Sequence, residues 1–393
     1  MKIKICAITT RGMTMKSFMV DTLNYFAENG FDVTIICEPS SIVSHTISSR
    51  VKYIPIEMKS GIERPSKMFA IIHQLIRLFR TEKYDIVQYA STNAGLYASL
   101  AAKRCHIPIR IFCQWGMMYV GSNGFRRFVF KNIERLICHC STSVQSDSSS
   151  NLEFAIKEHI VSKKKAEIVW NGSSTGVDTI LFSPDSRLKK EDENRRKFGI
   201  PTDAVVFGFV GRINKDKGIF ELITSFREMK RNGIHDVYLL LVGPKENDEK
   251  INLLLDKALK ETPELLYFGM SDSVIDFYSV MDFFVLPSYR EGIATVLLEA
   301  AACGLPIIST NILGSVDVVY EGRNGFLCNP KDVGSLFGAM KKAFNLNHEE
   351  YLRYSLNSRD LAVQMFDHET LAVKLLEDRI NKYEAVAIKK VKQ

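Results

Sequence analysis

The sequence predicts an α/β protein built from two doubly wound, Rossmann-like domains. At 393 residues the chain exceeds what one ordinary hydrophobic core accommodates. Short apolar runs alternate with helix-length amphipathic segments from the first residues onward, which is typical of a parallel sheet covered by helices. The alternation is interrupted at residues ~170–200 and then starts again, so two such domains are expected, with a ligand-binding cleft between them.

The first half carries five clear strand candidates and three helix candidates. The helices end in Lys, Arg or Gly, as helix termini do. The expected strands are 2–10, 32–38, 51–57, 85–90 and 109–115, and the expected helices are 15–30, 65–83 and 93–105.

A Gly/Ser-rich piece followed by a run of Lys, Glu, Asp and Arg marks the connection between the domains. Beyond it, strands are expected at 204–212, 236–244, 265–270, 282–288 and 305–310. The predicted domains are therefore 1–184 and 185–370. A C-terminal helix at about 370–393 is expected to pack back on the first domain.

Composition narrows the class of protein. The chain is 46% hydrophobic and 25% charged, as in soluble globular proteins, and no apolar run approaches the ~18 residues that a membrane span needs. The N-terminus resembles a buried strand more than a signal peptide. The eight cysteines follow no disulfide or zinc-site spacing, so reduced thiols and a cytoplasmic location are expected.

Charge is concentrated in the first half. Residues 1–184 contain 23 Lys and Arg against 14 Asp and Glu, a net charge of +9, whereas the remainder has a net charge of −2. Two amphipathic stretches, 64–80 and 124–140, set apolar residues against basic ones. They are either core helices with a solvated basic face or helices that dock on anionic lipid. Nucleic acid is disfavoured because no binding motif accompanies the basic residues.

The first candidate site is the stretch FVGRINKDKGIFELITSF, residues 209–226. A buried strand is expected to end at Gly211 and a helix to begin near Gly218, with Arg212, Lys215 and Lys217 between them. Backbone N–H groups at a helix start, together with cations, suit a diphosphate. The alternative is a basic turn that merely faces solvent.

The second candidate is PSYREGIATVLLEAAACGLPIIST, residues 287–310. Glu291 precedes Gly292 in an expected loop, and Glu299 stands among apolar residues of the following helix. A glutamate there is partly buried and needs a partner. A carboxylate accepts hydrogen bonds from two vicinal hydroxyls, and eight helical residues span up to ~12 Å, comparable to the length of a nucleotide sugar.

These stretches, followed by GRNGFLCNP, resemble the retaining glycosyltransferase family 4, which has the GT-B fold. The pair Glu291 and Glu299 matches that family's Glu-x7-Glu signature. WNGSSTGVDTILFSP resembles the interdomain stretch of bacterial capsule, O-antigen and glycan-assembly members. The likeness extends from about residue 165 to 345, and more loosely over the whole chain.

The resemblance implies roles for matching residues. Arg212 and Lys217 would bind the donor diphosphate and stabilise it as it leaves, Glu299 would hold the ribose, and Glu291 would contact the donor sugar. The donor-binding backbone would comprise Gly211, Gly292, Ile293, Ala294 and Thr295. No metal or other cofactor is expected, and the nucleoside diphosphate sugar is a substrate.

In the first half, the loop containing Gly12 corresponds to the family's glycine-rich loop beside donor and acceptor. Where many members carry a His-Gly pair, this chain has Trp115-Gly116, preceded by Gln114. Gln114 can supply a hydrogen bond but no proton transfer at neutral pH. Histidine-assisted catalysis is therefore in doubt, and His73, His106 and His139 are interpreted as structural.

The expected activity is retaining transfer of a sugar from a nucleoside diphosphate sugar, with UDP favoured, to a glycan acceptor, one carried on polyprenyl pyrophosphate being favoured. Peripheral contact with an anionic membrane would fit the charge distribution. The alternatives are a catalytically silent subunit of a glycan-assembly complex, and a nucleotide-sugar epimerase or a phosphorylase on the same fold. A sugar-binding protein would not need the phosphate-binding cations.

Overall fold

The chain divides into two compact units, each built around its own sheet. The first comprises the residues up to Thr175 and the segment from Glu369 onward, and the second is Gly176–His368. The computed structural model describes residues 2–59, 61 and 63–391. The boundary predicted at residue 184 lies inside the second unit, and the C-terminal segment belongs to the first.

Within the described residues, the first unit holds a seven-stranded parallel sheet of order β3-β2-β1-β4-β5-β6-β7. The strand order reverses between β1 and β4, which makes this the topological switch point where such sheets bind ligands. The strands are β1 (Lys4–Ile8), β2 (Asp32–Cys37), β3 (Val51–Pro55), β4 (Ile86–Ala90), β5 (Ile109–Gln114), β6 (Ser143–Ser146) and β7 (Ala166–Glu167).

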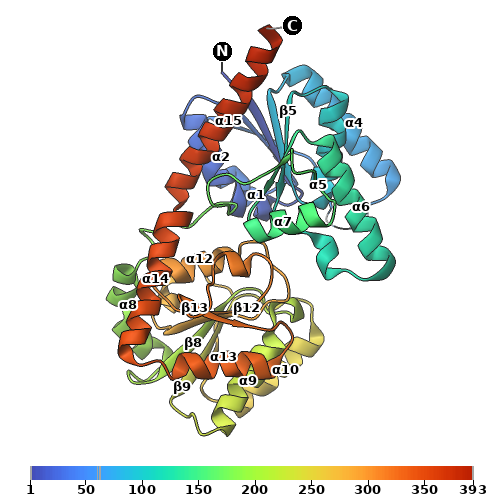
Figure 1. The fold of residues 1–393 in the computed structure, drawn as a ribbon. Helices are drawn as coiled ribbons and strands as arrows, with labels where there is room; N and C mark the ends of the chain where they lie inside the picture. The colour runs from blue at the N-terminus through green and yellow to red at the C-terminus, as the bar shows by residue number, and fades with distance from the viewer. Residues whose placement is uncertain (1, 60, 62, 392–393) are drawn as a thin grey trace. The chain divides into compact units, whose positions relative to one another are not determined.

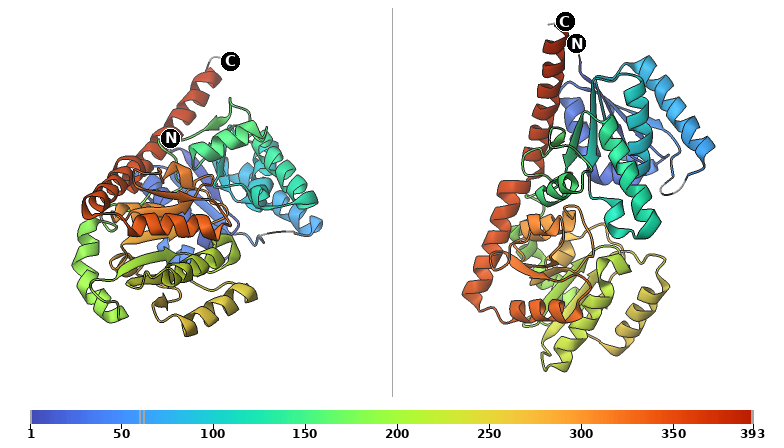
Figure 2. Two further views of the ribbon diagram at one scale, coloured as in Figure 1. Left: turned by 60° about the horizontal axis from the view of Figure 1, so that its bottom comes forward. Right: turned by 45° about the vertical axis from the view of Figure 1, so that its right-hand side comes forward.

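Helices cover both faces of this sheet (Figure 1). α4, α5 and α6 pack side by side on one face, while α1, α2 and α15 lie on the other (Figure 2). The helices are α1 (Gly12–Phe18), α2 (Val20–Glu28), α3 (Ser41–Thr46), α4 (Pro65–Glu82), α5 (Thr92–Arg104), the 3-10 helix η1 (Met118–Gly121), α6 (Gly124–Cys140), α7 (Ser149–Lys157) and α15 (His368–Val391).

In the second unit, the described residues form a six-stranded parallel sheet of order β10-β9-β8-β11-β12-β13. Its switch point lies between β8 and β11, and the strands are nearly all apolar because both faces are covered. The strands are β8 (Val205–Val210), β9 (Val237–Val242), β10 (Leu265–Tyr267), β11 (Phe283–Leu286), β12 (Ile307–Thr310) and β13 (Gly325–Cys328).

The helices of the second unit again form two layers. α9, α10 and α13 pack together on one face, and α8 packs on α11 and α12 on α14 (Figure 1). The elements are α8 (Pro184–Phe198), η2 (Lys215–Lys217), α9 (Ile219–Arg231), α10 (Glu249–Glu261), α11 (Ile275–Tyr278), α12 (Thr295–Ala302), η3 (Ser315–Asp317), α13 (Val333–Phe344) and α14 (His348–Phe366).

The prediction of two doubly wound parallel sheets is confirmed. Several local features differ from the sequence-based expectation, among them the strands β6, β7 and β13, which were not expected. The helix expected at 15–30 is interrupted at Met19, whose backbone is not helical. β6 was not expected, because its residues Ser143–Ser146 include one apolar side chain, yet all four are buried. Its Gln145 donates hydrogen bonds to Glu167 of β7 and Asp378 of α15, so tertiary partners offset the burial of a polar strand.

Candidate functional site

The two stretches singled out in the second half meet at the switch point of the second sheet. The loop after β8 carries Lys217, and the loop after β11 carries Glu291. The Lys217 Nζ atom lies 2.5 Å from the Glu291 Oε1 atom. Their side chains are 15% and 13% exposed, so the ion pair is largely shielded from water yet reachable. The sequence placed both residues in one site, and the structure brings them together.

The residues next to this ion pair fasten the two loops to each other. The Arg290 Nη2 atom lies 2.9 Å from the Asp216 Oδ2 atom, and the Tyr289 N–H donates to the Asp216 carbonyl. The Tyr289 hydroxyl donates to the Glu221 carboxylate at 2.8 Å. Thus Asp216-Lys217 faces Arg290-Glu291 with opposite charges at each position, and Lys217 and Glu291 are held in place by their neighbours.

Two glycines allow these loops to approach one another. Gly218, at φ +71°, lies so close to the end of β11 that a Cβ atom there would be 2.1 Å from the Pro287 carbonyl oxygen. Gly314, at φ +82°, lies equally close to the backbone of Gly292, where a Cβ atom would be 2.0 Å from the carbonyl oxygen. A larger residue at either position would push the loops apart, because backbone cannot yield as a side chain can.

Arg212 points to a residue that sequence reasoning did not identify. Its Nη1 atom lies 2.5 Å from the Glu246 Oε1 atom, in the loop between β9 and α10. The second Glu246 oxygen accepts a hydrogen bond from the Asn214 side-chain amide at 2.7 Å. That hydrogen bond, with the Arg212 charge, lowers the pKa of Glu246. Both cations predicted to bind phosphate therefore lie beside a carboxylate.

Glu299 has the partner that its apolar surroundings require. The Tyr278 hydroxyl donates a hydrogen bond to its Oε2 atom at 2.8 Å. Burial raises the pKa of Glu299 to about 7, and the hydrogen bond from Tyr278 only partly opposes this. The pKa of Tyr278 is itself raised well above its ordinary value, first by burial and then by the Glu299 charge, so it remains a neutral donor.

The backbone between the two glutamates turns into α12. Gly292 lies in the loop, Ile293 is buried, and Ala294 is the N-cap residue of the helix that begins at Thr295. Alanine has no side-chain acceptor, so it does not cap the helix as Ser or Asp would. No side chain therefore caps the start of α12; the Leu297 N–H donates to the Ala294 carbonyl, and the helix start keeps the positive dipole end that favours an anion. The two glutamates do not share a helix, because Glu291 precedes α12.

The residues predicted for the acceptor side all lie in the first unit. Gly12 begins α1, and its N–H donates to a Glu38 oxygen at 3.3 Å. Gln114 ends β5 fully buried, with its amide donating to Glu134 of α6 at 2.8 Å, and its Oε1 atom has no partner among the described residues. The Gln114 side chain is turned into the protein and does not face solvent. Its role at an acceptor stays a prediction.

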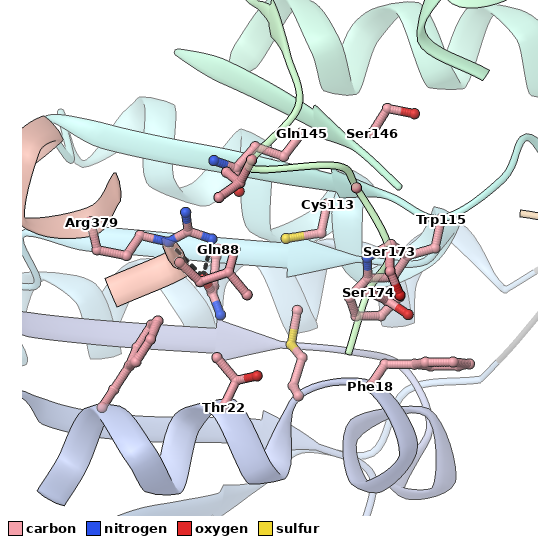
Figure 3. Close-up of a pocket in the computed structure, with 15 residues that line it drawn as sticks. Phe18, Thr22, Gln88, Cys113, Trp115, Gln145, Ser146, Ser173, Ser174 and Arg379 are labelled. Carbon is pink, nitrogen blue, oxygen red and sulfur yellow. Dashed lines mark hydrogen bonds between the residues drawn. The ribbon is translucent and has the colours of Figure 1, made fainter. Parts of the chain in front are cut away.

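Trp115 lines a small pocket of the first unit, about 40 Å³ in volume (Figure 3). Its ring lies 5.2 Å from that of Phe18, centroid to centroid. Deeper in the pocket, Arg379 of α15 donates two hydrogen bonds to Gln88 of β4. The pocket has room for a few waters. The α15 helix therefore contributes residues to the lining of this pocket.

The residues that sequence reasoning missed are partners of those it found. Glu246 and Tyr278 lie on elements remote in sequence from the residues they contact, and no local pattern marks them, whereas Glu221 lies within the first candidate stretch and is distinguished only by its contact with Tyr289. Asp216 and Arg290 carried a usable signal. Each stands beside a predicted site residue, and their opposite charges repeat the 74-residue offset of Lys217 and Glu291.

Metal-binding clusters, disulfides and membrane-spanning helices are all absent from the described part of the chain. No group of three or more His, Cys, Asp or Glu residues there could hold a metal ion. The eight cysteines all lie in that part and are free thiols. None of the described helices combines the length and apolar character needed to cross a membrane.

Models of two protein families match the chain. Residues 190–361 match the family described as glycosyl transferases group 1, and residues 4–148 match glycosyl transferase 4-like proteins. The capsular polysaccharide biosynthesis glycosyltransferase CapM of Staphylococcus aureus is 30% identical over 334 residues, 85% of each chain. An Escherichia coli protein named UDP-Gal:alpha-D-GlcNAc-diphosphoundecaprenol alpha-1,3-galactosyltransferase is 29% identical over 316 residues, 79% of each chain.

Solved structures show the same fold. The crystal structure of Anabaena Alr3699/HepE in complex with UDP superposes with a TM-score of 0.79 at 15% sequence identity, covering 96% of this chain and 100% of that one. The likeness extends through both units. It agrees with the two-domain α/β architecture expected from the sequence.

Proposed function

The chain belongs to the glycosyltransferase group 1 family, with a glycosyltransferase 4-like N-terminal domain, and on this premise we propose that it transfers a sugar from a UDP-sugar to a lipid-linked glycan in surface polysaccharide assembly. The observation that carries the proposal is the meeting of Lys217 and Glu291 at the switch point of the second sheet. A cation for phosphate and a carboxylate for hydroxyls stand side by side there, as a nucleotide sugar requires.

Neighbouring groups suggest where the remaining parts of the donor would bind. The nucleoside diphosphate would lie along the carboxyl edge of the sheet, with its phosphates at Lys217, Arg212 and the start of α12. Glu299, on that helix, would accept the two ribose hydroxyls in its ionised form. UDP is favoured because the E. coli relative is named for UDP-Gal and the Anabaena structure holds UDP. The E. coli name also supports a diphosphoundecaprenol-linked acceptor.

We assign retention of configuration to the reaction. The bond between the anomeric carbon and the diphosphate oxygen breaks while the acceptor hydroxyl forms a new bond on the same face. The departing phosphate oxygen takes the hydroxyl proton, so no side chain needs to act as base. Lys217 and Arg212 stabilise the charge that develops on the diphosphate, which is the role that a metal ion fills in other transferases, and the proposed reaction needs none. Glu291 orients the sugar.

A binding and transfer screen tests this function. UDP should raise the melting temperature more than GDP at the same concentration, because the ligand that binds more tightly stabilises the folded state more. At 100 times its Kd a ligand stabilises the folded state by about 2.7 kcal/mol. With the matching UDP-sugar and a polyprenyl-diphosphate-linked saccharide, transfer should proceed in EDTA. The product's anomeric configuration, read by NMR, should equal the donor's. Binding of UDP with neither transfer nor donor hydrolysis for any UDP-sugar would instead indicate a silent subunit.

A lipid-linked acceptor places part of the chain near a membrane, and α6 has the features for contact. Phe125 and Phe128 are 81% and 65% exposed, and their rings stack on each other. Arg126 lies beside them with its guanidinium over the Phe130 ring. Exposed aromatics flanked by cations are typical of helices that insert shallowly into anionic lipid. The helix is thus not simply a core helix with a basic face, and we propose that its first turns bind anionic phospholipid.

Replacing both aromatics, Phe125→Ser with Phe128→Ser, should weaken binding to phosphatidylglycerol vesicles about tenfold or more, because each buried Phe contributes about 1.5–3 kcal/mol. Vesicle co-sedimentation measures this. Leu352→Ser with Leu356→Ser removes two exposed apolar residues of α14 in the second unit and should leave binding unchanged. Equal binding by both variants, or equal binding of the wild type to phosphatidylcholine, would contradict the assignment.

A further inference from the structure

Arg212 is paired with a carboxylate at the proposed donor site. Its guanidinium faces Glu246, with the Nη1 and Oε1 atoms 2.5 Å apart, and the other Glu246 oxygen accepts from Asn214. The Asn214 side-chain oxygen in turn accepts the backbone N–H of Lys217 at 3.0 Å. Glu246 is therefore connected to both cations that the proposed function assigns to the diphosphate.

The position of Glu246 is fixed by backbone contacts that do not involve Arg212. The Glu246 N–H donates to the Ile213 carbonyl at 3.2 Å, and the Ile213 N–H donates to the Pro244 carbonyl at 2.9 Å. The Asn252 amide donates to the Glu246 carbonyl at 2.9 Å. The loop after β9 is thus fastened to the loop after β8, and the carboxylate remains beside the cations whether or not Arg212 is paired with it.

A carboxylate and a phosphate present similar oxygens to a guanidinium, so they compete for it. The Arg212 and Glu246 side chains are 59% and 39% exposed, and an ion pair this exposed contributes little free energy and exchanges easily. A diphosphate with two negative charges can therefore displace Glu246 from Arg212. Once the nucleotide leaves, Glu246 recaptures the guanidinium.

We propose that Glu246 is a positioning residue that holds Arg212 in the empty site and competes with the donor diphosphate for it. This inference rests on the proposed function and deepens it. Glu246 then lowers the affinity for nucleoside diphosphate and speeds release of the product. A residue that simply supported the loop would have the opposite effect, because its loss would weaken binding.

The test is UDP binding by Glu246→Gln, measured by calorimetry and stopped-flow at two salt concentrations. The amide keeps the size and can still accept from Asn214, but it lacks the charge. UDP should bind about two- to fivefold more tightly, within the range of an exposed ion pair, mainly through slower dissociation. The local positive charge rises by one, so the affinity should also fall more steeply with salt. In an Arg212→Ala background, the same substitution should change UDP affinity much less, because no guanidinium is left for Glu246 to hold, whereas the effect on the salt dependence, which follows from the charge alone, should persist.

Glu264→Gln is the matched control, because Glu264 pairs with Lys230 at 2.7 Å where β10 begins, away from the carboxyl edge of the sheet. It should leave UDP affinity unchanged. Glu246→Ala repeats the test in case the glutamine variant fails to fold. Unchanged or weaker UDP binding in a folded Glu246 variant would overturn the inference alone. A wild-type protein that binds no nucleoside diphosphate would overturn the proposed function as well.

Discussion

Lys217→Ala should lower kcat for sugar transfer by about 10²- to 10³-fold, with a smaller rise in the donor KM. On the proposed assignment the lysine faces the place where charge develops as the diphosphate departs, so its contribution would be greatest in the transition state. Removing one preorganised donor from such a site has an effect of this size in other enzymes. Initial rates over a range of UDP-sugar concentrations separate kcat from KM.

Lys215 supplies a matched control two residues away in the same loop. Its side chain is exposed, so Lys215→Ala removes the same charge from the same loop without removing the contact to Glu291. Transfer by this variant should stay within about threefold of wild type, since exposed charges contribute little. Thermal melting shows whether Lys217→Ala remains folded with Glu291 unpaired. A folded Lys217→Ala protein with near-wild-type kcat would refute the assignment of Lys217.

The proximity of Lys217 and Glu291 could be predicted from sequence because both residues follow strands that are recognisable in the sequence. Lys217 and Glu291 each lie a few residues beyond a fully apolar run, and parallel strands bring their carboxyl ends to one edge. Glu246 and Tyr278 could not be found this way. Each is recognisable only by the side chain it touches, and those contacts, with Arg212 and with Glu299, come from packing between distant segments.

The same limit applies to the fold. Most of the apolar strands were predicted, whereas β6 was not, because Gln145 is buried only where Glu167 and Asp378 satisfy its amide. The helix α15 was expected to pack on the first domain and it belongs to the first unit, but its buried contact there, between Arg379 and Gln88, could not be predicted from local sequence. Local sequence predicts elements whose burial is apolar. A buried polar side chain is stable only where a hydrogen-bond partner satisfies it, and that partner often lies far away in the sequence.

UDP binding should tighten as pH rises through 7, and Glu299→Gln should remove the part of this dependence that the carboxylate causes, leaving that of the terminal phosphate of UDP, whose second pKa is about 6. In the empty site the pKa of Glu299 is about 7. On the proposed assignment, ribose hydroxyls donate to the ionised carboxylate, so bound nucleotide would lower that pKa and binding would release a proton. Below pH 7 the affinity should therefore fall by up to about tenfold per pH unit until the pKa of the complex is reached. Calorimetry in two buffers of different ionisation enthalpy measures both the affinity and the proton release.

The stability of the empty protein should respond to the same pH in the opposite sense. Burial raises the pKa of Glu299 above its unfolded value, so the folded state holds the proton more tightly, and the free energy of unfolding falls as pH rises toward and through 7. Glu299→Gln should then melt higher than wild type at pH 8 while binding UDP more weakly. Glu134 of the first unit also has a pKa raised to about 7 by burial. Glu134→Gln should show the gain in stability and keep the pH dependence of UDP binding. If Glu134→Gln instead abolished this pH dependence, the assignment of Glu299 to the ribose would be wrong.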